Sequence, residues 1–485
     1  MKVVLVGGTP AEHAGDRGRT WDGRKDFAYS SYNYAIGLLR TCALADPRAR
    51  EVTDIALLDF PVARTQRRLG EAELSAILAE RPDVVGFSTG CWDVDLFEES
   101  ATLLRRRAPS IRLIAGGPGV GQHAARRMRA SPAFDAVITG EGEGTFVELC
   151  RRGFDSYEGL GGVVFRDGDR LVENPEPAPV VDLAAQPSAY LDGGFEPRAD
   201  ALLVEPSRGC KFRCSFCSWS RLGGGVRQAS RARIAGEVAF GLRRGHGAVN
   251  FCDTAINHDT ERLRELCEAI TEGDPGHRLR GSAFIRHEAL DEAQLDILAE
   301  HPFSELILGI ESTHPRALRT VGKAPLDLAT LERRLEAIGR TGSRVTLSFI
   351  SGLPGDSLEG FAATLDWAEA VVRRLPEVVN MACFFWLAVL PGTRYEARAE
   401  TYGFAVARRG TPYVVRSRDF SEGELVRISR MLQERVARTP RLACEDVHGV
   451  VSRARDVRDL EATILADPAA RDDRRPPPLD GRRTS

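Results

Sequence analysis

The chain has 485 residues, 43% of them hydrophobic, so it can bury more than one core and should divide into two or three domains. Lys and Arg number 66 against 69 Asp and Glu, a net charge of −3, which argues against nucleic acid or a membrane surface as partner. No signal-peptide pattern is visible and apolar runs stay below the ~18 residues of a membrane span, so we expect a cytoplasmic protein.

The first 150 residues alternate short β-branched runs with stretches long enough for helices. The predicted strands cover residues 3–6, 55–60, 84–88, 113–115 and 136–139. This alternation is typical of an α/β domain with a doubly wound parallel sheet of the flavodoxin or Rossmann type.

Residues 151–198 lose the alternation and accumulate Gly and Pro, so we expect a linker with a small hairpin near 162–172. Six strand and helix units then follow within 199–404, which predicts a partial (β/α)6 barrel. Residues 405–466 should form a small helical region, with Ser421 capping a helix from 422 to about 438. The tail, 467–485, is too polar to fold.

Three of the ten cysteines are clustered, and the other seven stand singly. Cys210, Cys214 and Cys217 form a CxxxCxxC run directly after the apolar strand 202–205. Clustered thiolates in a reducing compartment are more often metal ligands than disulfides. Three protein thiolates would leave one iron of a 4Fe-4S cluster open to S-adenosylmethionine. The alternative is a zinc site completed by His246 or Cys252.

This loop resembles that of the radical S-adenosylmethionine (SAM) superfamily, which also has an aromatic residue before the last cysteine, here Phe216. The resemblance covers nearly the whole chain. It implies a 4Fe-4S cluster on the three cysteines and reductive cleavage of SAM to a 5'-deoxyadenosyl radical. It also implies that Phe216 lies beside the adenine, although a packing role fits equally well.

Later strands carry further segments similar to those of the family. The resemblance implies that Asp253, and with it Asn257, lies near the methionyl amine, although the Gly-Gly-Glu of many members is absent. Glu311 would contact the ribose or methionine end of SAM, or alternatively pair with Arg286. The remaining expected SAM contacts are Arg286 itself, Ser348 and Ile350.

The first domain resembles the cobalamin-binding domain of this superfamily, through segments 82–88, 115–118 and 140–146. Small residues after its strands, namely Ser88, Gly116 and Gly117, are candidates for admitting the nucleotide tail of the cofactor. Ordinary tight turns on a scaffold domain are the alternative. The cobalt-ligand motif DxHxxG is not intact, and His13 is a weak candidate because an exposed loop histidine explains it too.

The resemblance implies a radical SAM enzyme acting on a small molecule, with carbon methylation through cobalamin as the leading reaction. One alternative is cobalamin-independent dehydration of a diol such as an aminoglycoside sugar, ring contraction or epimerisation. Another is a corrinoid or cluster carrier. We expect a natural-product substrate and an electron donor such as flavodoxin or ferredoxin.

Overall fold

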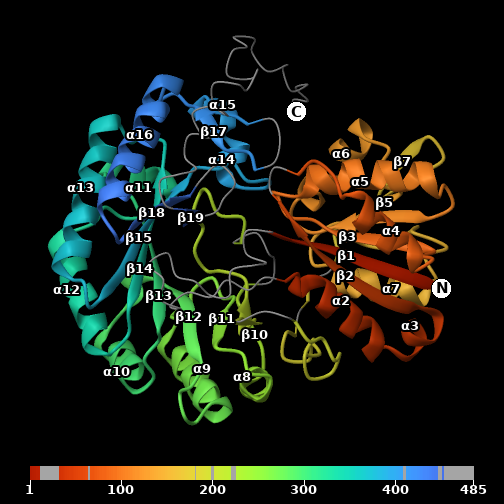
Figure 1. Cartoon of the computed structure of the whole chain (residues 1–485), viewed down its shortest axis with the longest axis horizontal. Helices are drawn as coiled ribbons and strands as arrows, with labels where there is room; N and C mark the ends of the chain where they lie inside the picture. The colour runs from red at the N-terminus through yellow and green to blue at the C-terminus, as the bar shows by residue number, and fades with distance from the viewer. Residues whose placement is uncertain are drawn as a thin grey trace, which may run out of the picture.

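Two mainly parallel β-sheets, each covered by helices, form the body of the protein, and Figure 1 shows them side by side. The computed structural model describes residues 1–10, 32–63, 66–177, 179–180, 182–197, 201–219, 225–407, 411–445 and 451–452. His13 and the predicted tail at 467–485 lie outside these residues.

The first sheet has the strand order β2-β1-β3-β4-β5-β6-β7. Its five parallel strands are β1 Lys2–Pro10, β2 Asp54–Val62, β3 Val84–Ser88, β4 Arg112–Gly116 and β5 Ala136–Ile138. All five predicted strands are therefore present, because buried β-branched runs pair along their whole length.

Helices cover both faces of this sheet, as the doubly wound fold requires. They are α2 Tyr34–Ala45, α3 Pro47–Val52, α4 Glu71–Ala79, α5 Val94–Arg107, α6 Ala124–Ala130 and α7 Glu143–Arg151. Alternate strand residues enter two separate cores: Val4 and Val6 pack on one face, Val3 and Leu5 on the other. The predicted fold class of this domain is confirmed.

The segment expected as a linker contributes two strands to the first sheet. Strands β6 Val163–Asp167 and β7 Arg170–Glu173 form the expected hairpin, but β6 also pairs antiparallel with β5. Val163 and Phe165 are buried in the core of this domain. The sheet therefore continues to Glu173, because an apolar hairpin can cover the open edge of β5.

The second sheet has the order β19-β18-β15-β14-β13-β12-β11-β8. The six expected strands are β8 Ala201–Val204, β11 Ala248–Phe251, β12 Arg280–Ile285, β13 Glu305–Glu311, β14 Val345–Ser351 and β15 Val379–Trp386. They are all parallel and form the predicted partial barrel.

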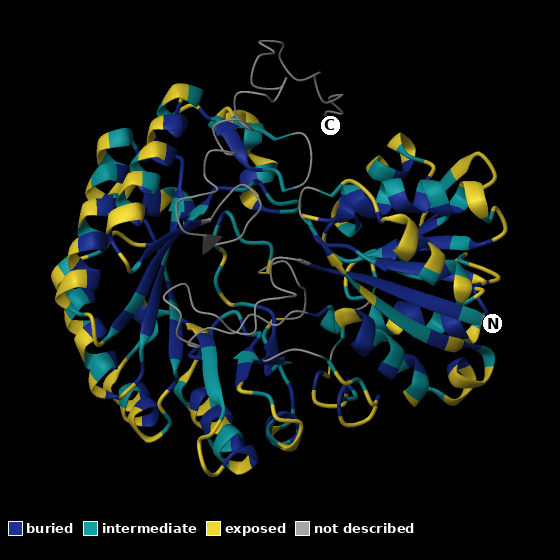
Figure 2. Ribbon diagram, in the orientation of Figure 1, coloured by how far each residue is buried: buried dark blue, intermediate teal, exposed yellow. Residues whose placement is uncertain are grey.

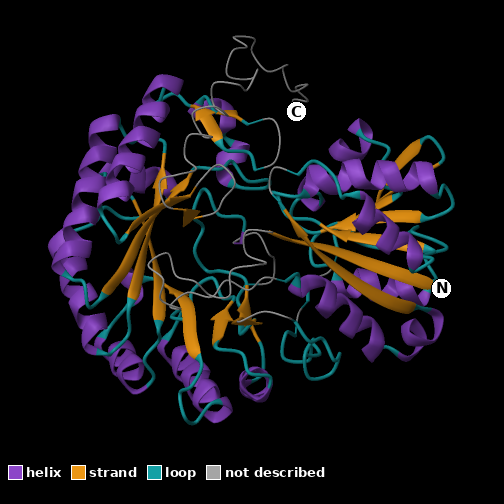
Figure 3. Ribbon diagram, viewed as in Figure 1, coloured by secondary structure: helices purple, strands orange, loops and turns teal. Residues whose placement is uncertain are grey.

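Helices line the outer side of this sheet, and in Figures 2 and 3 they surround its buried strands. They are α8 Arg231–Arg243, α9 Thr260–Gly273, α10 Glu292–Glu300, α11 Pro315–Val321, α12 Leu328–Arg340 and α13 Leu358–Arg374. Phe349 of β14 stacks on Phe384 of β15 with ring centroids 4.7 Å apart, and Phe361 of α13 packs on Phe384. This aromatic contact joins two central strands to a covering helix.

The sequence predicted a helical C-terminal region, but the structure shows strands there as well. Ser421 caps α16 Glu422–Arg438 through a capping box with Glu424. Short helices α14 Arg394–Ala397 and α15 Ala399–Tyr402 precede it. The region also holds strands β16 Ala405–Val406, β17 Val414–Arg416, β18 Leu442–Glu445 and β19 Val451–Ser452. Because β18 pairs with β15, it extends the barrel sheet by a seventh parallel strand.

Among the residues that the structure describes, no helix is long and apolar enough to cross a membrane.

Candidate functional site

The three clustered cysteines lie on a loop whose two ends are paired. The loop begins after β9 Ser207–Arg208 and ends at β10 Arg227–Gln228, where Arg208 and Arg227 are antiparallel partners. Gly209 has φ +98°, and a Cβ there would overlap the Gly225 carbonyl, so the two ends approach closely. The two ends of the loop that carries the three cysteines are therefore paired with each other.

The cysteine loop is held against the barrel by backbone hydrogen bonds. The Ser215 N–H donates to the Val321 carbonyl at 3.0 Å, and its hydroxyl donates to the Thr320 carbonyl at 2.8 Å. The Tyr395 N–H in turn donates to the Ser215 carbonyl at 3.0 Å. Contacts from two different elements therefore fix the middle of the loop.

The thiols of Cys210, Cys214 and Cys217 are half-buried, and none of them is in a disulfide. In the described part of the chain, no group of three or more His, Cys, Asp or Glu side chains surrounds a single ion position. A cubane does not require such convergence, because each cysteine binds a different iron. Three accessible soft donors on one short loop fit a 4Fe-4S cluster.

Arg286, which follows β12, contacts the cysteine loop. Its Nη1 donates to Cys214 Sγ at 3.5 Å, and its guanidinium lies 4.3 Å from the centre of the Phe212 ring. A second guanidinium nitrogen pairs with Glu288 at 3.0 Å. The structure thus places a permanent positive charge beside one expected cluster ligand.

Asn257 holds the backbone of Arg286. Its Oδ1 accepts from the Arg286 N–H at 2.8 Å, and its Nδ2 donates to the Arg286 carbonyl at 2.9 Å and to Gln294 Oε1 at 3.2 Å. Asn257 is only 1% exposed. Its contacts make it a positioning residue for Arg286, while the expected contact with SAM remains a prediction.

Asp253 lies just beyond β11, below the base of the cysteine loop. Its Oδ1 accepts from the Ser207 hydroxyl at 2.6 Å. Burial raises the pKa of this carboxyl to about 6, although the hydrogen bonds that it accepts from Ser207 and nearby backbone N–H groups lower the pKa. The carboxyl therefore ties the second strand of the barrel to the residue that precedes Arg208.

Glu311 ends β13 at a bulge, with an unusual φ of +66°. Its Oε1 pairs with Lys323 Nζ at 2.8 Å, and both side chains are less than one tenth exposed. The expected alternative, a pair with Arg286, is wrong. Arg286 instead uses Glu288 and Cys214, because its backbone is fixed on the neighbouring strand by Asn257.

Sequence reasoning missed Lys323, which lies beyond α11 and belongs to no motif. The lysine also donates to the Gly309 carbonyl. A Cβ on Gly309 would lie 2.5 Å from Glu311 Oε1, so glycine makes room for the ion pair. The only signal in the sequence was that a buried carboxylate needs a cation.

Ser348 and Ile350 occupy alternate positions of β14 and are half-buried, whereas Phe349 between them is fully buried against the helices. They therefore lie on the inner face of the barrel. Phe216 is partly buried against the barrel core. These positions are compatible with the expected contacts to adenine, which stay predictions.

Two exposed aromatic residues were not anticipated from the sequence. Trp219, just after the cysteines, and Phe284 of β12 are 44% and 40% exposed and meet edge to face at 6.2 Å. Phe284 alternates with Ala283 and Ile285, which belong to the core, so it lies on the inner face. The pair is a candidate apolar wall for a substrate.

A cavity of about 250 Å³ opens at the carboxyl ends of β3, β4 and β5. Its lining includes all three residues expected to admit a nucleotide tail, namely Ser88, Gly116 and Gly117. Side chains of α2 and α7, including Ile36, Leu39 and Phe146, make the remaining wall mostly apolar. A largely apolar cavity at this edge of a doubly wound sheet fits the tail of a nucleotide-bearing cofactor.

The two glycines of this cavity differ in what they require. Gly117 has φ +97°, and a Cβ there would lie 2.5 Å from the Thr89 carbonyl oxygen, so the turn itself demands glycine. At Gly116 a Cβ would meet Ile138 at an ordinary 3.6 Å. Of the two glycines, only Gly116 could be replaced by a larger residue without straining the backbone, so its small size matters for the space in the cavity.

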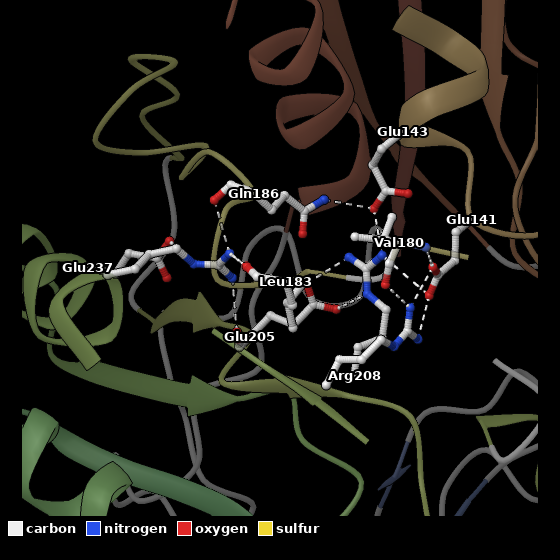
Figure 4. Close-up of polar contacts among 10 residues, drawn as sticks. Glu141, Glu143, Val180, Leu183, Gln186, Glu205, Arg208 and Glu237 are labelled. Atoms are coloured by element: carbon white, nitrogen blue, oxygen red, sulfur yellow. Dashed lines mark hydrogen bonds and ion pairs between the residues drawn. The ribbon is translucent and has the colours of Figure 1, made fainter. Parts of the chain in front are cut away.

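A buried polar network joins this cavity to the cysteine loop, as Figure 4 shows. Arg208 Nη1 donates to Glu143 Oε1 at 2.8 Å, and the same guanidinium forms a two-point contact with Glu205. Arg227 donates to both oxygens of Glu141 at 2.7 Å. Glu141, Glu143 and Arg208 all line the cavity, so the base of the cysteine loop forms part of the cavity wall.

Two parts of the chain match models of known protein families. The B12 binding domain family model matches residues 39–150, and the radical SAM superfamily model matches residues 204–368. The chain thus carries a B12-binding domain and a radical SAM domain. The B12-binding domain comes first along the chain, and the radical SAM domain follows it.

The relatives include the cobalamin-dependent radical SAM methyltransferase TokK of Streptomyces tokunonensis, 26% identical over 67% of this chain and 49% of TokK. Cytidylyl-2-hydroxyethylphosphonate methyltransferase of Streptomyces wedmorensis is 28% identical over 59% of this chain and 62% of that protein. The chain thus spans about half of TokK.

Among solved structures, the fold is similar to that of the radical SAM methyltransferase TsrM from Kitasatospora setae, determined with cobalamin and a [4Fe-4S] cluster bound. The TM-score is 0.63 with 19% identity, over 84% of this chain and 76% of TsrM. This similarity confirms the predicted fold class, and the two family models give the predicted order of a B12-binding domain followed by a radical SAM domain. The two domains imply a 4Fe-4S cluster, SAM and cobalamin as cofactors.

Proposed function

We propose that this protein transfers a methyl group to a carbon atom of a small molecule, using SAM at the cysteine loop and cobalamin in the first-domain cavity. One observation carries the proposal: Arg208, two residues before Cys210, also lines that cavity. A corrin seated there would lie beside the cysteine loop. Transfer between two cofactors requires this proximity.

When bound, the cluster supplies the electron that cleaves SAM, and cobalamin supplies the methyl group. Cys210, Cys214 and Cys217 would hold the cluster, with Arg286 stabilising negative charge at Cys214. Asp253, Glu311, Ser348, Ile350 and Phe216 would surround SAM on the inner face of the barrel. Ser88 and Gly116 would admit the nucleotide tail of cobalamin, with Gly117 shaping the turn.

Trp219 and Phe284 would form one wall for the substrate. The similar proteins TokK and cytidylyl-2-hydroxyethylphosphonate methyltransferase, both methyltransferases from Streptomyces, support a natural-product substrate and a methyl transfer. A small electron-transfer protein such as flavodoxin or ferredoxin would supply the reducing electron.

The test is anaerobic incubation of the reconstituted protein with SAM, a reductant and hydroxocobalamin. Methyl transfer predicts both 5'-deoxyadenosine and S-adenosylhomocysteine, the second only when the corrin is present. Alanine at Cys210, Cys214 or Cys217 should abolish both products, whereas Cys444→Ala, in the remote strand β18, should not. Turnover at the same rate without any corrin would contradict methylation and favour a cobalamin-independent radical reaction.

A further inference from the structure

The base of the cysteine loop is fixed to the wall of the first-domain cavity. Arg208 and Arg227 are register partners at the two ends of the loop. Arg208 reaches Glu143 at 2.8 Å and Glu141 at 3.6 Å, and Arg227 reaches Glu141 at 2.7 Å. Both ends of the loop therefore depend on two carboxylates of the other domain (Figure 4).

These contacts are buried, so the loss of any one of them destabilises the others. Arg208 and Arg227 are 9% and 6% exposed in their side chains, and Glu141 is 6% exposed. Burial opposes ionisation of Glu141, yet hydrogen bonds from Arg227 and the Val180 N–H keep its pKa below the usual value. A buried ion network that loses one partner leaves an uncompensated charge, so intermediate arrangements are disfavoured.

The same two carboxylates belong to the segment that shapes the cavity. Residues Gly140, Glu141, Gly142 and Glu143 connect β5 to α7, and all four line the cavity together with Arg208. A ligand in the cavity therefore touches side chains that also hold the loop. A shift of this segment on ligand binding would be transmitted through Arg208 and Arg227 to the nearby residues Gly209 and Gly225, where the cysteine loop begins and ends.

We propose that Glu141 and Glu143 couple the cavity to the cysteine loop, so that occupancy of the cavity and binding of a cluster by Cys210, Cys214 and Cys217 favour each other. This inference rests on the proposed function, which makes cobalamin the ligand of the cavity. Coupling between two binding sites is reciprocal. A bound cluster must then tighten cobalamin binding by the same factor by which bound cobalamin tightens cluster binding.

The test measures the Kd of hydroxocobalamin by anaerobic equilibrium dialysis, on the full chain with and without the reconstituted cluster. We expect the protein with the cluster to bind about five-fold tighter or more, the lower end of common coupling factors. In Glu141→Gln/Glu143→Gln the ratio of the two Kd values should fall to about one. The milder Glu143→Gln keeps the Arg208 contact with Glu205, so it should fold and still lower the ratio.

The matched control is Glu396→Gln. Glu396 of α14 receives a 2.6 Å contact from His123 and so joins the same two domains, but neither residue lines the cavity. In Glu396→Gln, the ratio of the hydroxocobalamin Kd values without and with the cluster should equal that of the parent. A parent ratio of one, or a parent-like ratio in both glutamate variants, overturns the coupling while leaving cobalamin binding intact. Failure of the parent to bind hydroxocobalamin at all would instead overturn the proposed function, and the coupling with it.

Discussion

Replacing Gly116 with phenylalanine should fill the first-domain cavity without breaking the sheet that forms it. The residue ends β4, lines the cavity, and has a backbone conformation that any L residue can adopt. A Cβ there meets Ile138 at 3.6 Å, an ordinary contact. The added ring has the cavity of about 250 Å³ in front of it.

A ligand entering the cavity of Gly116→Phe must displace the ring into packed surroundings. Such overpacking costs about 1–3 kcal/mol, which raises the Kd of hydroxocobalamin by about 5- to 150-fold. Equilibrium dialysis measures that change directly. Cleavage of SAM to 5'-deoxyadenosine should persist, because the cysteines and the inner face of the barrel are untouched.

Gly116→Ala is the control and should bind hydroxocobalamin as the parent does. Gly117→Ala should instead lower the melting temperature, because it forces a side chain to φ +97° against the Thr89 carbonyl. If Gly116→Phe were folded and bound the corrin with the parent affinity, the cavity would not be the site of the nucleotide tail.

Three further predictions concern charged residues of the barrel. Arg286→Leu removes the donor to Cys214 Sγ, so a redox titration followed by electron paramagnetic resonance should show the cluster potential falling by about 60 mV, equivalent to ~1.4 kcal/mol for one electron; an unchanged potential would contradict the contact. Glu311→Gln leaves Lys323 buried without its partner and should reduce the free energy of unfolding by about 3–5 kcal/mol, whereas Glu311→Gln/Lys323→Met should recover much of it; equal losses would argue against the pair. Burial raises the pKa of Glu237 from 4.5 to about 7, so the folded state binds its proton more tightly than the unfolded state. The contribution of this protonated carboxyl to the free energy of unfolding is complete below about pH 4.5. It is lost as the pH rises through 7, and the total loss is up to about 3 kcal/mol. Urea unfolding at pH 5 and pH 8 should show this loss in the parent and not in Glu237→Gln.

The strands and the cysteine loop were predictable because their signals are local. Alternation of β-branched runs with helix-sized stretches predicted five strands of the first sheet and six of the second. Ser421 marked the start of α16 because a capping residue acts on its own turn. The hairpin at 162–172 was also predicted, but its pairing with β5 was not, since pairing depends on which edge is open.

Side-chain partners were less predictable. Glu311 required a cation, and the sequence offered several, but the bulge in β13 and the position after α11 put Lys323 there instead of Arg286. Gly116 and Gly117 looked equivalent as small residues after a strand. Only the backbone angles and the Thr89 carbonyl separate a glycine that the turn needs from one that leaves room for a ligand.

Spacing and periodicity act over a few residues, so the amino-acid sequence by itself determined the fold class, the order of the two domains and the CxxxCxxC loop. Contact between Glu143 and Arg208, which are 65 positions apart, depends on how two separately formed sheets dock. Burial of a charge demands a partner without saying which one. The tertiary structure alone decided that the wall of the cavity and the base of the cysteine loop are made of the same side chains.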